Sequence, residues 1–156
     1  MGTWDIGPFE NDTASDFAND LDDAAKGERQ TLIRRVLMRT AGNRDYLEAP
    51  DAEEAVAAAA LLAAQCPGGE PVSPHYCPDE PVPSLPTDRS RLAVEALDRV
   101  LADESELSEL WGVAEDGRRW RDSIRQMRRV LDPTPQTRTS NAQDLWISSG
   151  RTYLPV

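Results

Sequence analysis

Four aspartates near the start of the chain recur at steps of three or four residues: Asp12, Asp16, Asp20 and Asp23. A helix over this segment would place all four carboxylates on one face. A divalent cation needs oxygen ligands that converge from several directions, and one straight helix supplies only part of such a set. We interpret the row either as a solvated face, partly neutralised by arginines of the next helix, or as a docking face for a basic protein. These four are our candidate partner-docking residues.

A second group of side chains with chemical potential lies in a proline-rich stretch: Cys66, His75, Cys77 and Asp79. Zinc prefers thiolate and imidazole ligands, but the chain has no Cys-x-x-Cys pair and the first gap is long. Because His75 is the only histidine, no pair of histidines can bind a metal or relay a proton. We expect ordinary loop residues here, with no catalytic residue, no cofactor and no metal site.

Two further sets of polar and aromatic residues could do chemistry by type but also have a structural interpretation. Asn11 and Asp12 could be catalytic by residue type, yet their place before a helix favours capping. Four of the aromatics could line a ligand pocket, although in a small helical protein such residues usually form the core. They are Trp4, Phe9, Trp111 and Trp120. We expect capping and core packing at these positions.

A segment of opposite charge lies late in the chain. Residues 117–131 contain six arginines and one acid, a net charge of +5. They could bind an acidic protein or phosphate, but nucleic acid would require a larger positive field than a chain of net charge −11 offers. We expect these arginines to pair within the protein or at its surface. The acids available are those of the first helix and Asp103, Glu104, Glu106 and Glu109.

Apolar residues at steps of three and four predict five main helices and one shorter helical piece. The helices are expected over residues 12–25, 28–41, 51–66, 88–103, 106–111 and 118–131. The third is apolar on nearly every side, which is typical of a helix buried at the centre of a bundle. Seven of the twelve prolines fall in residues 67–86 and exclude helix and central strand there.

The expected fold is therefore an all-α, single-domain bundle of about five helices with a proline-rich loop. The domain covers residues 1–131, and its N-terminal aromatic segment packs on the bundle. Residues 132–156 form a C-terminal tail that is docked or partly disordered.

Three local signals predict where helices begin and end. Thr13 and Asp16 fit a capping box for the first helix, with the residue pair at 11–12 as an alternative cap. Gly27 is expected to end this helix. Asp51, three residues before a glutamate, fits a second capping box at the start of the central helix.

Composition narrows the class of protein further. The 156 residues suit one domain with a real core. No apolar run reaches about 18 residues, so we expect no membrane span. The start lacks a basic stretch followed by an apolar one, so we also expect no secretory signal. With only two cysteines, a reduced cytoplasmic setting is the expected location.

The opening of the chain resembles a bacterial family known as domain of unknown function 4259. The residues that carry the resemblance are Gly2, Thr3, Trp4, Gly7, Phe9, Asn11, Asp12, Ala14, Asp16 and Phe17. Residues 51–64 and 105–111 are also similar, as is Trp120, whereas Asp5 stands where the family usually has glycine. The resemblance covers roughly residues 2–131 and implies no activity.

These observations favour a non-enzymatic protein-interaction module, immunity-like or regulatory, whose partner is a basic protein. No nucleic acid and no membrane is expected as a partner, and the protein would be a monomer or a homodimer. Two alternatives remain open. One is a metal-dependent hydrolase or other small enzyme that uses the acids with Asn11 and His75. The other is a nucleic-acid mimic, whose acids would need phosphate-like spacing across several elements.

Overall fold

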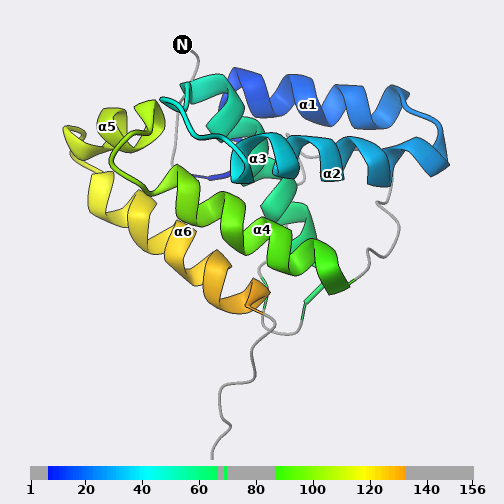
Figure 1. Ribbon diagram of the computed structural model, residues 1–156. Coiled ribbons are helices and arrows are strands. Elements are labelled where there is room, and N and C mark those ends of the chain that lie inside the picture. Colours follow the sequence, from blue (N-terminus) through cyan, green and yellow to red (C-terminus); the bar gives the residue numbers. More distant parts are fainter. Residues whose placement is uncertain (1–6, 67–68, 70–86, 133–156) are drawn as a thin grey trace, which may run out of the picture.

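Six α-helices form the fold, in a computed structural model that describes residues 7–66, 69 and 87–132 (Figure 1). They are α1 (Asp12–Asp23), α2 (Lys26–Ala41), α3 (Ala49–Ala63), α4 (Thr87–Val100), α5 (Glu106–Gly112) and α6 (Gly117–Leu131). No strand is found among these residues, only one isolated bridge between Leu47 and Ser105. The predicted all-α bundle is confirmed, and α5 is the expected shorter piece.

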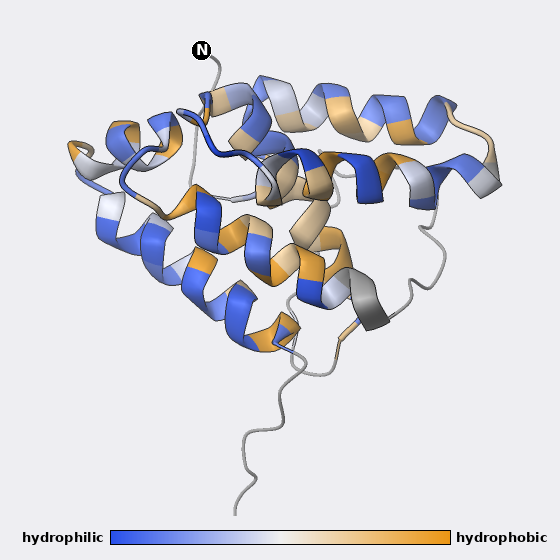
Figure 2. Ribbon diagram, viewed as in Figure 1, coloured by the Kyte–Doolittle hydropathy of each residue, from blue (hydrophilic) through white to orange (hydrophobic). Residues whose placement is uncertain are grey.

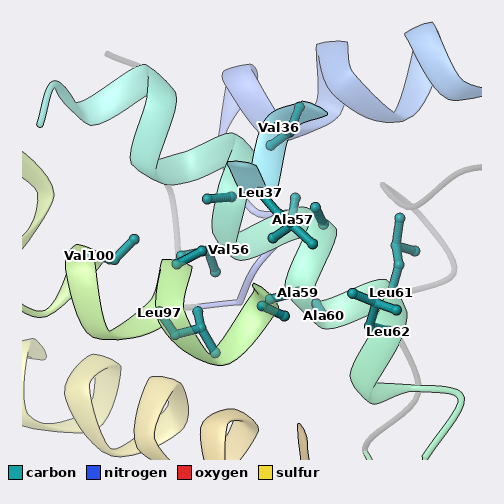
Figure 3. Packing of buried hydrophobic residues seen from close by; sticks show 14 of the residues in the cluster. Val36, Leu37, Val56, Ala57, Ala59, Ala60, Leu61, Leu62, Leu97 and Val100 are labelled. Atoms are coloured by element: carbon teal, nitrogen blue, oxygen red, sulfur yellow. The ribbon is translucent and has the colours of Figure 1, made fainter. Parts of the chain in front are cut away.

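Helix α3 is the centre of the bundle. It packs against α1, α2, α4, α5 and α6, and twelve of its fifteen residues are buried. Alanine fills most of these positions, and its small side chain lets neighbouring helices approach closely. Figure 3 shows Val36 and Leu37 of α2 and Leu97 and Val100 of α4 gathered around this helix. The prediction of a central helix buried on all sides is confirmed.

The outer helices bury one face each. Helix α1 buries Ala14, Phe17, Ala18 and Leu21. The buried apolar residues of α2 are Ile33, Val36 and Leu37, and those of α6 are Trp120, Ile124 and Leu131. These positions recur at helical spacing and agree with the predicted stripes. Figure 2 shows the alternation of hydrophobic and hydrophilic residues along the outer helices.

The start of α1 is capped by Asn11, the alternative to the Thr13 capping box. Its Oδ1 accepts a hydrogen bond from the Ala14 N–H at 2.8 Å, and its extended backbone is that of an N-cap. Phe9, just before the cap, is 1% exposed and lies in the core. The other aromatic of the opening segment, Trp4, lies outside the described residues, as do most of the proline-rich loop and the tail from residue 133.

The prediction that Gly27 ends α1 is wrong. Helix α1 ends at Asp23, and Gly27 is already the second residue of α2. Two extended alanines, Ala24 and Ala25, make the connection. The buried Arg29 donates a hydrogen bond from Nε to the Leu21 carbonyl at 2.9 Å, so the side chain of α2 satisfies a carbonyl in the last turn of α1.

The predicted capping box at Asp51 is also wrong, because α3 begins two residues earlier, at Ala49. The Ala49 N–H donates instead to Glu106 Oε1 at 2.8 Å. Glu106 belongs to α5, so the free N–H of this helix start is satisfied by a side chain far away in the sequence. A carboxylate at this end also suits the positive end of the helix dipole.

A single arginine joins the two loops beside this contact. Arg99 donates from Nε to the Asn43 carbonyl at 3.1 Å and from Nη2 to the Glu104 carbonyl at 3.1 Å, and Nη2 also bonds the Asp45 carbonyl. The backbone of Leu47 adds two hydrogen bonds to this junction. Its N–H donates to the Glu104 carbonyl at 2.9 Å, and its carbonyl accepts from the Glu106 N–H at 2.8 Å. The planar guanidinium thereby ties the α2–α3 connection to the α4–α5 connection.

The tight packing around α3 predicts that an added side chain there is costly. Ala59 is fully buried, so Ala59→Leu should lower the free energy of unfolding by about 1–3 kcal/mol. Chemical denaturation monitored by circular dichroism measures this change. The control is Ala114→Leu, at an exposed loop position, which should change stability little. Equal stability of the two variants would contradict close packing at α3.

The geometry of the Arg99 junction predicts that lysine cannot replace this arginine. Lysine carries one ammonium group and cannot span the carbonyls of two loops as the guanidinium does, so Arg99→Lys should cost about 1–3 kcal/mol. Arg91→Lys, at an exposed position of the same helix, is the matched control. If thermal unfolding shows the two variants to be equally stable, the junction contributes nothing.

Candidate functional site

The four candidate docking residues lie on the solvent face of α1. Asp12, Asp16, Asp20 and Asp23 are all exposed, and the buried stripe of α1 lies opposite to them. We call these four side chains the acidic row. Binding a partner on this face would leave the packing of α1 on α3 intact, because the two faces share no residue.

No arginine of α2 forms a described ion pair with the acidic row. Arg39 pairs instead with two acids of α3, at 3.6 Å from Asp51 and 2.5 Å from Glu54. Among the residues that the structure describes, no cation lies within 4.0 Å of an acidic-row carboxylate. Like charges at helical spacing repel by a few tenths of a kcal/mol per pair. The row therefore carries an electrostatic cost that a cationic partner would relieve.

The pKa of Glu54 in α3 responds both to burial and to a charge of the acidic row. Burial raises the pKa of its carboxyl most, and the negative charges of Asp51 and Asp20 raise it further. Arg39 acts in the opposite direction, through its charge and its hydrogen bond. Asp20 thus acts electrostatically across the α1–α3 contact, while its own side chain stays exposed.

Helix α6 contains six arginines, and one of them, Arg128, pairs with an acid of another helix. Arg128 makes two hydrogen bonds to Asp98 of α4, Nε to Oδ1 at 2.6 Å and Nη2 to Oδ2 at 3.2 Å. This contact is the largest cause that raises the pKa of Arg128. Asp132 lies 3.7 Å from the same guanidinium. Pairing was expected with α1 or with the acids at 103–109; the partner is Asp98, because α6 packs against α4.

The other arginines of α6 face solvent or form weak contacts. Arg119 pairs with Asp116 at 3.2 Å and Arg125 with Asp122 at 3.7 Å, both exposed pairs one turn apart. Exposed pairs of this kind contribute little to stability. The exposed arginines at steps of seven and four are Arg118, Arg125 and Arg129, and we call them the basic row.

The two charged rows lie on different sides of the bundle. Helix α1 packs on α3, whereas α6 packs on α3, α4 and α5. Figure 1 shows α1 along the upper edge and α6 along the lower left edge of the molecule, with other helices between them. The charge segregation seen in the sequence is therefore also a segregation in space.

The described aromatic candidates lie in the core or pack against it. Phe9 and Trp120 are buried, as predicted. Trp111 is half-buried and stacks on Trp120, with ring centroids 5.8 Å apart and an interplanar angle of 7°. This stack fixes α5 against α6.

The second candidate group is only partly described. Cys66 is half-buried and its Sγ contacts the Leu62 carbonyl at 3.5 Å. His75, Cys77 and Asp79 lie outside the described residues. Within the ranges 7–66 and 87–132, no group of three or more histidine, cysteine, aspartate or glutamate side chains could hold a metal ion.

Three exposed residues at or near α5 are not among the candidates predicted from the sequence. Tyr46, Leu110 and Val113 are exposed, Val113 at 90%. The Tyr46 hydroxyl donates to Glu109 Oε1 at 2.9 Å, which connects the α2–α3 loop to α5. The three residues stand singly in the α2–α3 loop and in the last turn and C-cap of α5, so helical spacing does not single them out.

Comparison with known proteins gives one match. A family model described as Domain of unknown function (DUF4259) matches residues 2–123. The chain belongs to this family. The match confirms the resemblance drawn from the opening residues and extends from the N-terminal motif into α6. No curated protein and no solved structure matches the chain.

The DUF4259 assignment carries no activity, so the function must be inferred from the side chains. The matched region contains the whole acidic row and Arg118, while Arg125 and Arg129 lie beyond it. None of the described helices is both long and apolar enough to cross a membrane.

The contact between Glu54 and Arg39 predicts a pH effect with a defined sign. The folded-state pKa of Glu54 lies above its usual 4.5, so the folded protein binds more protons than the unfolded chain. The contribution of Glu54 to stability therefore falls as pH rises from the unfolded pKa through the folded pKa. Arg39→Gln should raise the Glu54 pKa further and enlarge this fall, because the cation that opposes the effect of burial is lost.

An NMR titration of the Glu54 carboxyl carbon, with urea unfolding from about pH 4 to pH 7, measures both effects. Arg35→Gln is the matched control: Arg35 is exposed on the same helix and has no described ion pair with Glu54. An unchanged Glu54 pKa in Arg39→Gln would contradict the electrostatic account.

Proposed function

We propose that this DUF4259 protein is a non-enzymatic protein-interaction module, immunity-like or regulatory, that docks a basic protein through its acidic row. One observation carries the proposal: four exposed carboxylates share the outer face of α1, with no cation within ion-pair distance among the described residues. The proposed setting is the bacterial cytoplasm, and the low cysteine content supports it.

The electrostatics of the chain suit recognition of a cation-rich surface. The net charge of −11 attracts a basic partner and disfavours nucleic acid and anionic membranes. A complementary charged surface mainly accelerates association and selects against wrong partners. At physiological salt the Debye length is about 8 Å, so local pairing at the acidic row decides the affinity.

The rigidity of the bundle supports docking without rearrangement. Helix α1 is fixed by its buried stripe and by the Asn11 cap, so the carboxylates are presented on a regular helix. A partner then loses little free energy to ordering the docking face. The α1 side chains that contact α3 are not those offered to the partner.

Capture from a native lysate tests the proposal at low and at high salt. The test variant combines Asp12→Asn, Asp16→Asn, Asp20→Asn and Asp23→Asn, which changes the net charge from −11 to −7. We expect a single stoichiometric partner with the wild type, lost at high salt. The variant loses four exposed ion pairs with the partner, so we expect it to bind about tenfold more weakly, or weaker still.

A matched control separates local pairing from net charge. It removes four exposed acids elsewhere, by Glu95→Gln, Asp103→Asn, Glu104→Gln and Glu115→Gln, and also has a net charge of −7. The control should keep the partner. Equal loss in both variants, or no partner of the wild type at either salt, would overturn docking at the acidic row. Circular dichroism verifies that both variants remain helical.

A further inference from the structure

The basic row of α6 has the same length as the acidic row of α1. Arg118 to Arg129 spans eleven residue steps, as does Asp12 to Asp23, so both rows extend about 16 Å along their helices at 1.5 Å per residue. The charges of the two helices also match, because α1 contains five aspartates and no base and α6 six arginines and one aspartate.

One molecule cannot pair these two rows with each other. Helix α1 packs on α3, and α6 packs on α3, α4 and α5, so the outer faces of α1 and α6 point away from the same core (Figure 1). Both rows are exposed at the same time. A second molecule can therefore reach either row of the first.

The arginines of the basic row are held only weakly where they are. Arg125 lies 3.7 Å from the exposed Asp122, and Arg129 donates to Gln126 at 2.6 Å. Arg118 has no ion pair among the described residues. Arg128, by contrast, is held by two hydrogen bonds to Asp98. The basic row is thus free to exchange partners at small cost.

We infer that the basic row of α6 docks the acidic row of a second copy of this chain. The contact joins two different surfaces, so it is heterologous and repeats head to tail, either closing into a ring or extending into an open chain. The inference rests on the proposed docking role of the acidic row and gives it a local cationic surface, the basic row, on a chain whose net charge is itself −11. One residue works against the contact: Asp122 lies between Arg118 and Arg125 and opposes an aspartate of the other copy.

Sedimentation velocity of the full chain at low and at physiological salt tests the inference, at protein concentrations up to about 1 mM. The first variant lacks the acidic row, through the four Asp→Asn changes given above. The second lacks the basic row, through Arg118→Gln, Arg125→Gln and Arg129→Gln. Each should be monomeric alone. Their mixture should form a complex of two chains and no larger species, because each molecule then offers only one of the two rows.

Two further variants keep the test independent of folding defects. Asp122→Asn removes the like charge and should tighten association about threefold, which a damaged fold could not do. Arg34→Gln, Arg35→Gln and Arg44→Gln together remove three exposed arginines elsewhere and should still associate.

The outcomes also separate this inference from the proposed function. A wild type that stays monomeric at every concentration and at both salts overturns self-docking. Capture of a different basic protein through the acidic row would still support the proposed function in that case. Failure of the two variants to associate when mixed, or association unaffected by Asp122→Asn, would likewise overturn the contact between the rows.

Discussion

The need to bury α3 on every side governs this structure. A helix made largely of alanine, leucine and valine has no face suited to water, so the other five helices pack around it. Because alanine is small, the stabilisation comes from close approach of many neighbours and less from any one large side chain. The large side chains lie on the surrounding helices, as Phe17, Leu37, Leu97 and Trp120 do.

Because each outer helix buries only one face in this arrangement, its other face can carry charged residues. Helix α1 uses its outer face for aspartates and α6 uses its outer face for arginines, and neither set is needed to cover α3. The polar contacts that close the bundle are few and specific. Arg99 and Glu106 join the two loops at the N-terminal end of α3, and Arg128 joins α6 to α4. The residues of the acidic row and of the basic row are therefore not the ones that make these contacts.

Local patterns predicted the helices well and their ends less well. The stripes of α1, α2 and α6 follow helical spacing and were correct. The two errors, at Gly27 and Asp51, share one cause: each helix end is satisfied by a side chain from elsewhere, Arg29 for the end of α1 and Glu106 for the start of α3. Asn11, which caps its own helix, was among the predicted caps.

The sequence by itself determined the helical class, the central place of α3 and membership of the DUF4259 family, because apolar spacing and the opening motif are properties of neighbouring residues. It also determined that two oppositely charged helices exist. Only the tertiary structure decided where those charges lie relative to one another. It decided that Arg39 pairs with Glu54 of α3 and that Arg128 pairs with Asp98 of α4. It also decided that Glu53 is buried at 2% exposure while the adjacent Glu54 reaches Arg39. Such choices depend on how the helices pack against each other across the bundle, and spacing along one helix does not encode that.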